Sequence, residues 1–465
     1  MTTTNNNKKQ KEMKKHLFFW ASLLVAGLAL TACGGDDADD FSDKTTPVAP
    51  TGKQTWTVTV GAGVMTRGLN DDLSPKWSAD DEVYVYHGTT KVGTLKPTAA
   101  SDDGSVTLTG ELENSDYSTE SGYNTLNLSY KYEYFDEPYY CGQDGTIEDI
   151  AENFDFLRAT VTITAVNTST RTLTVSTANF ETLQSIMCLT FTEPLLDGDW
   201  IGIWGGEFDA EVYPTGPVAE GTPIYVAVPF SSTPSSYELQ FYIANSSSGD
   251  EVYLVNDWPT KSLQNGKQYT ATVKIEGVRL WKKGPFWATK NLGASSKTDS
   301  GDYFAWGDIK GYSSTSGHEF TLANYKYYDS VNGVYTKYTS DGADLLAEDD
   351  AAVQILGDRW HIPLSPEFFT LKENTEQSDA TVNGVKGKLF SAKSGTAYSG
   401  RSIFMPYAGV MYSSGLSGFG TDGQYLLRNG CGTTQMSEIE ISDNWCSTGD
   451  EYPRYDGKPI RPLKD

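Results

Sequence analysis

Short runs in which apolar and polar residues alternate recur along most of the chain, and they restrict it to β-structure. Residues 56–60, 82–86 and 161–164 are examples, and turns rich in Gly, Pro, Asn and Ser separate such runs. Successive side chains of a strand point to opposite faces, so each run fits a strand with one buried face. Thr, Ser, Gly and Tyr are abundant and long helical blocks are few, which favours a mainly β fold with many turns.

The length of 465 residues exceeds what one hydrophobic core usually serves, so the fold is expected to be multidomain. Two β-sandwiches are predicted in succession, and the remainder, where Trp and Gly rise together among irregular loops, is predicted to be a separate domain of a different kind. Two short helices are expected in that remainder, over 348–356 and 365–371, from acidic residues or proline at their starts. The predicted segments are a signal peptide over 1–32, a flexible tether over 33–52, sandwiches over 53–155 and 156–277, and the final domain over 278–465.

The N-terminus has the pattern of a secretion signal. Five lysines precede an apolar run over residues 17–30, and small residues follow it. The run has 14 residues, which is short of the ~20 that a spanning helix needs. The run ends in Leu30-Thr31-Ala32-Cys33, so Cys33 directly follows the small residues of a cleavage site. An ordinary signal peptide with an incidental cysteine is the alternative.

Residues 30–33 resemble the lipobox of bacterial lipoproteins, which implies that Cys33 is acylated and becomes the mature N-terminus. The acidic residues at 36–40 resemble the signal that exports lipoproteins to the outer face of the outer membrane in the Bacteroides group. The resemblance implies a lipid-anchored, surface-exposed outer-membrane protein whose first partner is the membrane lipid. The net charge of −25 disfavours nucleic acid as a partner.

The first half of the chain carries a second resemblance, to the fimbrillin-like (Mfa-like) pilins. The segments that carry it are 66–68, 77–86, 92–95, 223–229 and 263–275. The resemblance implies two tandem transthyretin-like sandwiches and a role in surface fimbriae. It also implies processing after Arg67, which would open a groove for a donor strand from another fimbrial subunit. The alternative is that Arg67 is a surface residue in a turn.

Residues 278–465 resemble the Fibrobacter succinogenes major paralogous (FISUMP) domain, which is related in fold to C-type lectin-like domains, so the resemblance implies an α+β, C-type lectin-like domain. The blocks that carry the resemblance are 287–294, 301–308, 348–352, 360–363, 403–409 and 460–462. His361 departs from the basic residue usual in its block, and 426–429 replace an expected Trp-Ser-Ser. The resemblance implies a ligand face in the irregular region after the core helices.

That region is rich in Tyr, Trp and Arg spaced by Gly and Ser, which is the composition of paratopes and of binding hot spots. The alternative is that some of these aromatic residues belong to the core. The predicted ligand-binding residues are Tyr412, Tyr425, Arg428, Asn429, Asn444, Trp445, Tyr452 and Arg454.

The chain offers little sequence evidence for catalysis or metal binding. The chain has no Gly-x-Ser-x-Gly, His-Glu-x-x-His or P-loop motif, so we expect no catalytic residues. Its four histidines are scattered singly and it has no Cys-x-x-Cys motif, so no metal site or cofactor is expected; calcium at acidic loops is the alternative. Cys431 and Cys446 are expected to form a disulfide or to remain two thiols.

The function expected from these features is that of a cell-surface adhesin, a fimbrial tip subunit whose C-terminal domain binds a protein or glycan partner on a host or neighbouring cell. The rival is a carbohydrate-handling or enzyme-associated surface lipoprotein whose C-terminal domain recognises glycan.

Overall fold

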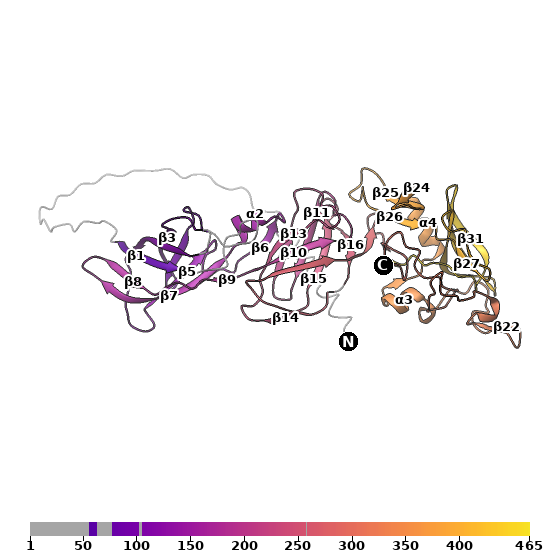
Figure 1. Ribbon diagram of the computed structural model, residues 1–465, viewed down its shortest axis with the longest axis horizontal. Helices are drawn as coiled ribbons and strands as arrows, with labels where there is room; N and C mark the ends of the chain where they lie inside the picture. Colours follow the sequence, from indigo (N-terminus) through magenta and orange to yellow (C-terminus); the bar gives the residue numbers. More distant parts are fainter. Residues whose placement is uncertain (1–54, 63–76, 102–104, 257) are drawn as a thin grey trace, which may run out of the picture. The chain divides into compact units, whose positions relative to one another are not determined.

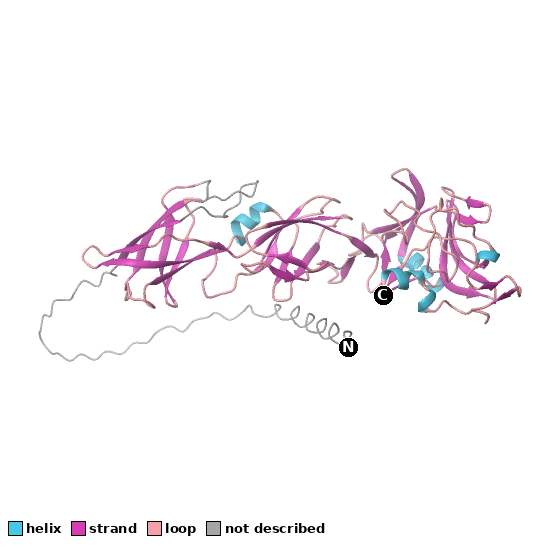
Figure 2. Ribbon diagram, turned by 60° about the horizontal axis from the view of Figure 1, so that its bottom comes forward, coloured by secondary structure: helices cyan, strands magenta, loops and turns pink. Residues whose placement is uncertain are grey.

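The structure of the protein is a computed structural model that describes residues 55–62, 77–101, 105–256 and 258–465. Cys33, the signal peptide and tether predicted over 1–52, and Arg67 lie outside the described residues. Strands far outnumber helices in the described part, which confirms the mainly β, multidomain class (Figure 2). No helix in the described part is long and apolar enough to span a bilayer.

The first domain, whose strands are indigo to purple in Figure 1, is a sheet that closes on itself around one hydrophobic cluster. Its strand order is β5-β2-β3-β4-β1-β8-β7-β9, and a further pairing of β5 with β7 closes the sheet. In β1, Trp56, Val58, Val60 and Ala62 are buried while the residues between them face outward, as the alternation predicted. The strands are β1 (Thr55–Ala62), β2 (Val83–His87), β3 (Thr90–Pro97), β4 (Val106–Glu113), β5 (Thr125–Tyr130), β7 (Leu157–Asn167), β8 (Thr172–Val175) and β9 (Glu181–Thr182).

The pairing of β7 and β8 corrects the boundary predicted between residues 155 and 156. Both strands follow that boundary, yet they hydrogen-bond into the first sheet. Conversely, β6 (Tyr140–Gln143) precedes the boundary and pairs with β12 of the next domain. Between β6 and β7, α2 (Ile147–Asp149) and the π-helix η1 (Ile150–Phe154) bring Ile150 and Phe154 into the core of that second domain. Alternation of apolar and polar residues predicts a strand but not the strand with which it pairs. The sequence therefore did not show that the chain enters the second domain at β6 and returns to the first sheet at β7.

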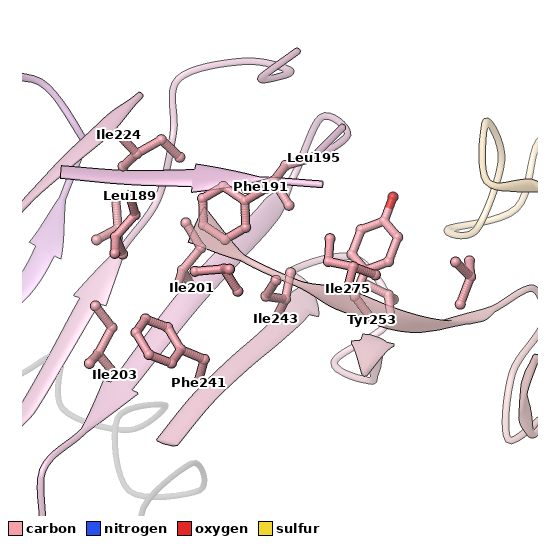
Figure 3. Packing of buried hydrophobic residues seen from close by; sticks show 14 of the residues in the cluster. Leu189, Phe191, Leu195, Ile201, Ile203, Ile224, Phe241, Ile243, Tyr253 and Ile275 are labelled. Carbon is pink, nitrogen blue, oxygen red and sulfur yellow. The ribbon is translucent and has the colours of Figure 1, made fainter. Parts of the chain in front are cut away.

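The second domain is a two-sheet sandwich. One sheet has the order β13-β10-β18, and the other contains β6-β12-β11-β15-β16. Apolar side chains from both sheets meet between them, including Leu189, Phe191, Ile201 and Ile243 (Figure 3). The strands are β10 (Ser185–Phe191), β11 (Asp199–Trp204), β12 (Asp209–Val212), β13 (Ile224–Val228), β15 (Gln240–Asn245), β16 (Glu251–Val255) and β18 (Gln268–Val273), with a separate pair β14 (Ser235–Tyr237) and β17 (Lys261–Leu263).

The larger sheet of the second domain continues into the C-terminal region. β19 (Ile275–Arg279) pairs with β16 on one side and with β20 (Phe286–Ala288) on the other. β20 then pairs with β32 (Leu463–Lys464), and β32 pairs with β23 (Trp360–His361). The boundary predicted between residues 277 and 278 therefore falls inside β19. The two edges of this strand pair with β16, before the boundary, and with β20, after it.

The C-terminal region combines short helices, small sheets and irregular segments. The two predicted helices are present as α3 (Ala351–Leu356) and α4 (Ser365–Asn374), and the Asp350 carboxylate caps α3 by accepting from the N–H groups of Ala352 and Val353. The other elements are η2 (Leu322–Asn324), β21 (Tyr328–Asp329), β22 (Val334–Tyr335), η3 (Ala347–Asp349), β24 (Thr375–Val382), β25 (Val385–Ala392), β26 (Ser402–Pro406), β27 (Val410–Tyr412), β28 (Gly415–Ser417), β29 (Asp422–Cys431), β30 (Gln435–Ser442) and β31 (Trp445–Pro453).

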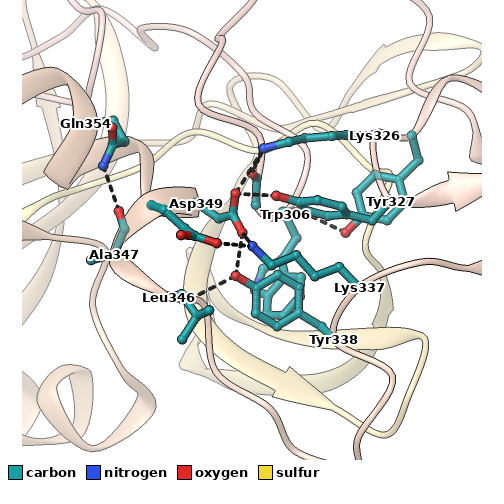
Figure 4. A network of polar contacts seen from close by, with 12 residues as sticks. Trp306, Lys326, Tyr327, Lys337, Tyr338, Leu346, Ala347, Asp349 and Gln354 are labelled. Atoms are coloured by element: carbon teal, nitrogen blue, oxygen red, sulfur yellow. Dashed lines mark hydrogen bonds and ion pairs between the residues drawn. The ribbon is translucent and has the colours of Figure 1, made fainter.

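The buried carboxylate of Asp349 accepts hydrogen bonds from several side chains of the irregular segment before α3 (Figure 4). Asp349 is 4% exposed, and its Oδ1 accepts from Lys326 at 3.0 Å and from the hydroxyl of Tyr327. Its Oδ2 accepts from Lys337 at 2.5 Å and from the hydroxyl of Tyr338 at 2.6 Å. Four donors on one carboxylate fix the chain over 326–349, where little regular secondary structure exists to do so.

Candidate ligand-binding site

The predicted ligand region folds into the three-stranded antiparallel sheet β29-β30-β31. Gln424, Glu440 and Ser447 are cross-strand partners, and Ser442 is the partner of Trp445. Because side chains two residues apart share a face, Gln424, Glu440 and Trp445 lie on the same side of the sheet, which we call the outer face. Tyr425 and Ile439 lie on the opposite side and are fully buried.

Glu440 joins two aromatic side chains on the outer face. Its Oε2 accepts from the indole N–H of Trp445 at 3.0 Å, and its Oε1 accepts from the hydroxyl of Tyr452. The bond to Glu440 and burial both raise the pKa of Tyr452, so the phenol stays protonated and donates. A Cβ at Gly449 would lie 2.7 Å from the Tyr452 ring and 2.8 Å from Glu440 Oε1, so only glycine leaves room for this arrangement. Trp445 is 56% exposed although it is held at one edge.

Charged groups lie beneath these aromatics. Glu438 and Lys458 form an ion pair and both are fully buried. The Lys458 ammonium also lies 5.1 Å from the centre of the Tyr452 ring. Burial raises the pKa of Glu438, and the charge of Lys458 acts in the opposite direction. Burial likewise raises the pKa of Tyr412, with the negative charges of Asp456 and Glu438 adding to the effect.

The outer face therefore offers an exposed indole, phenols and a carboxylate on a rigid sheet. An aromatic ring stacks on apolar groups of a ligand, while the Glu440 carboxylate can accept from hydroxyls or amides. This combination suits a neutral polar ligand such as a sugar, or an aromatic-rich protein surface. Of the predicted residues, Trp445 and Tyr452 both contact Glu440 here. Tyr412 of β27 lies near Glu438 and Tyr452. Asn444 is exposed in the turn that leads to Trp445.

Two predicted ligand residues are structural instead. Tyr425 is fully buried, and its hydroxyl donates to the Pro406 carbonyl at 2.7 Å. Arg454 is also fully buried; its guanidinium lies 4.5 Å from the Trp306 ring and donates to the carbonyls of Gln435, Tyr338 and Thr433. A guanidinium has several N–H donors in a fixed geometry, so it can hydrogen-bond to several carbonyls of an irregular backbone at once. Arg454 therefore has a structural role and does not face a ligand.

Arg428 and Asn429 lie elsewhere, at the irregular part of β29 where its register with β30 shifts. The Asn429 amide accepts from the Ser365 N–H at 2.7 Å and donates to Asp344 at 3.1 Å. These bonds attach two loops to the sheet. The prediction did not include Glu438 and Glu440. They alternate with Ile439 and Ile441, so the strand pattern indicated that the two glutamates share one face.

Of the two alternatives predicted for Cys431 and Cys446, the structure has two thiols rather than a disulfide, and all four cysteines of the described residues are free. Cys431 pairs with Gln435 and Cys446 pairs with Ile441, so they lie at opposite ends of β30. Six residues of strand separate these positions by about 20 Å. A disulfide needs Cα atoms within about 7 Å of each other.

Comparisons with known proteins found structural neighbours only. No protein-family model matches the chain, and no curated protein matches it. Among solved structures, the chain is similar to a fimbrial protein from Bacteroides ovatus (9% identity, TM-score 0.22, covering 89% of this chain and 100% of the other). It is also similar to proteins described as candidate cell adhesion proteins from Bacteroides uniformis (12% identity, TM-score 0.22, covering 49% and 94%) and Bacteroides eggerthii (10%, TM-score 0.24, covering 49% and 87%). At such low scores these likenesses do not determine the function of this chain.

Proposed function

We propose that the protein is a cell-surface adhesin of the fimbrillin-like type, whose C-terminal region binds a protein or glycan partner through the outer face of β29-β30-β31. The observation that carries the proposal is the Glu440 carboxylate, which holds the exposed Trp445 and the adjoining Tyr452 in fixed positions. Pre-positioned aromatic side chains lose little conformational entropy on binding, so they suit a recognition surface.

The proposal includes anchoring by acylated Cys33 at the outer membrane, with the acidic residues at 36–40 as the export signal. Two or more acyl chains give stable anchoring at ~0.8 kcal/mol per buried methylene. The lipid would then lie at one end of the chain and the ligand-binding residues close to the other. In this proposal the chain is an outward-facing binder, and no enzymatic role is proposed for it.

Binding is expected to depend on the two aromatic residues. Trp445→Ala should weaken binding at least about 30-fold, because truncating a central interface tryptophan typically costs 2 kcal/mol or more. Tyr452→Phe should give a smaller loss, because it removes only the hydroxyl that Glu440 orients. The measurement is binding of the fluorescently labelled protein to a glycan array and to fixed epithelial and bacterial cells.

The matched control is Tyr123→Ala, which removes a 67% exposed aromatic side chain from the first domain and should leave binding unchanged. Point variants are preferable to deletion of 278–465, because β19 pairs with strands on both sides of that boundary. Binding retained by Trp445→Ala would move the ligand site away from the outer face. Binding to glycans alone, together with a glycan-processing partner, would favour the carbohydrate-handling alternative.

We further propose that the protein joins other fimbrial subunits by donor-strand addition in the first domain. β1 lies inside the closed sheet, paired with β4 over eight residues and with β8 over three. Cleavage after Arg67 would separate β1 from the rest of the domain, and its loss would leave β4 and β8 with unpaired backbone groups. A donor strand with alternating apolar residues could then replace Trp56, Val58 and Val60.

Arg67→Ala is therefore expected to abolish cleavage and incorporation into fimbriae. Proteolytic trimming is read by mass spectrometry of surface-released protein, and incorporation by immunogold labelling, which for a tip subunit should mark one end of each fimbria. Lys53→Ala changes another basic residue, two positions before β1 in the sequence; it is the control and should be processed normally. Normal assembly of the Arg67→Ala protein would show that the strand is not released at this position.

A further inference from the structure

His361 and Glu367, six positions apart, and Asp465, about a hundred positions later, bring metal-binding atoms together in the C-terminal region. His361 Nε2 lies 3.0 Å from Glu367 Oε1. A carboxylate oxygen of Asp465 completes the group, and the three donor atoms lie within 4.8 Å of one another. His361 and Glu367 are partly buried, while Asp465 is exposed.

The surrounding elements hold these side chains in place. His361 is in β23, where it pairs with Leu463 of β32, and Asp465 follows β32 directly. Glu367 is in the first turn of α4, where its Oε2 accepts from the Leu364 N–H at 2.7 Å. The capping bond fixes the carboxyl group and uses only Oε2, so Oε1 remains directed toward the imidazole.

We propose that His361, Glu367 and Asp465 form a binding site for a divalent transition metal ion such as Zn²⁺. One imidazole and two carboxylates are ligands that Zn²⁺ accepts, at distances of about 2.0–2.2 Å, which place neighbouring ligand atoms roughly 3.3 Å apart. The observed 3.0 Å between His361 Nε2 and Glu367 Oε1 is close to that spacing. Mg²⁺ and Ca²⁺ prefer sites made of oxygen alone, so the imidazole favours a transition metal.

The bound ion would have an open side, because Asp465 is exposed and the protein supplies three ligands. The positive charge of Arg428 acts on both His361 and Glu367, so it disfavours the binding of a metal cation at these residues. The site is therefore expected to exchange its metal readily and to bind it more weakly than a closed four-ligand structural site. Binding would connect β23, the start of α4 and the residue after β32.

The test is calorimetric titration of the full-length protein, purified without a histidine tag, with ZnCl₂. The wild type is expected to bind one equivalent, and Zn²⁺ should raise its melting temperature, since a ligand that binds only the folded state stabilises it. His361→Gln and Glu367→Gln should each weaken binding at least about tenfold, and Asp465→Asn should weaken it as well. Gln at 367 keeps an oxygen for the capping bond but loses the ion pair with His361, so its melting temperature without metal should fall only slightly below that of the wild type.

The matched control is His318→Gln, because His318 stacks on Tyr312 at 3.6 Å and is not part of the group. This variant should bind Zn²⁺ as the wild type does. The proposal is overturned if the wild type shows no saturable binding, if any of the three ligand variants binds with wild-type affinity, or if MgCl₂ and CaCl₂ bind as tightly as ZnCl₂.

Discussion

Arg461→Met is expected to lower the free energy of unfolding of the C-terminal region by roughly 3–5 kcal/mol. Arg461 is fully buried, and its guanidinium donates to Asn291 Oδ1 at 2.9 Å and to the carbonyls of Ala288 at 3.1 Å and Phe404 at 2.9 Å. Burial lowers its pKa to about 10, which leaves the group charged at neutral pH. Methionine fills much of the volume but leaves these three buried acceptors without their donor.

The measurement is urea denaturation read by hydrogen exchange in peptides from 286–464, which reports this region apart from the first domain. Arg359→Met makes the same chemical change at an exposed position and should alter stability by no more than about 0.5 kcal/mol. A loss below about 1 kcal/mol for Arg461→Met would mean that water or neighbouring groups satisfy the three acceptors.

Asp349→Ala is expected to cost about 3 kcal/mol in the same assay, because it removes the one carboxylate that four donors share. The hydroxyls of Tyr327 and Tyr338 would lose their acceptor, and both residues are buried. Lys326 and Lys337 are about one-third exposed, so water can solvate them in part. Hydrogen exchange in 326–349 should rise most, since the network fixes that segment.

Glu348→Gln is the matched control for Asp349→Ala. Glu348 also contacts Lys337 but its side chain is 69% exposed, so its contribution should stay below about 1 kcal/mol. If both substitutions lower the free energy of unfolding by the same amount, the burial of Asp349 does not determine its contribution to stability.

The same carboxylate is expected to make the region sensitive to acid. Burial alone would raise the pKa of Asp349, but the bonds from Lys337, Tyr327, Tyr338 and Lys326 together hold it below its usual value of 3.8. The folded state thus releases this proton more readily than the unfolded chain, so the stabilisation is complete above about pH 4 and declines as the pH falls below it. The stability difference between the wild type and Asp349→Asn should shrink between pH 5 and pH 2.

The alternating pattern of residues such as Trp56, Val58 and Val60 was sufficient to predict strands and the mainly β class. The pattern was insufficient to predict the domain boundary. The sequences of β7 and β8 would show the same alternation whether these strands paired with β5 and β1 or with strands of the next domain. Pairing depends on backbone hydrogen bonds between segments distant in sequence, and these leave no local signal.

The ligand-binding prediction shows the same limit at the level of side chains. Tyr425 and Trp445 have similar Gly- and Ser-rich surroundings in sequence, yet Tyr425 is fully buried and Trp445 is 56% exposed. The difference arises because β29 places Tyr425 on the inner face, while Trp445 begins β31 on the outer face. The composition identified the region that contains the site but could not show which of its residues lie on which face of the sheet.

The amino-acid sequence alone determined the β class, the turns and the two short helices, because these depend on residues within a few positions of each other. Only the tertiary structure decided which strands share a sheet and that Cys431 and Cys446 lie too far apart to pair. It also brought His361, Glu367 and Asp465 together, although the sequence presented a single histidine beside Trp360. Such groups form through contacts between residues up to about a hundred positions apart, and the spacing of residues along the chain carries no record of them.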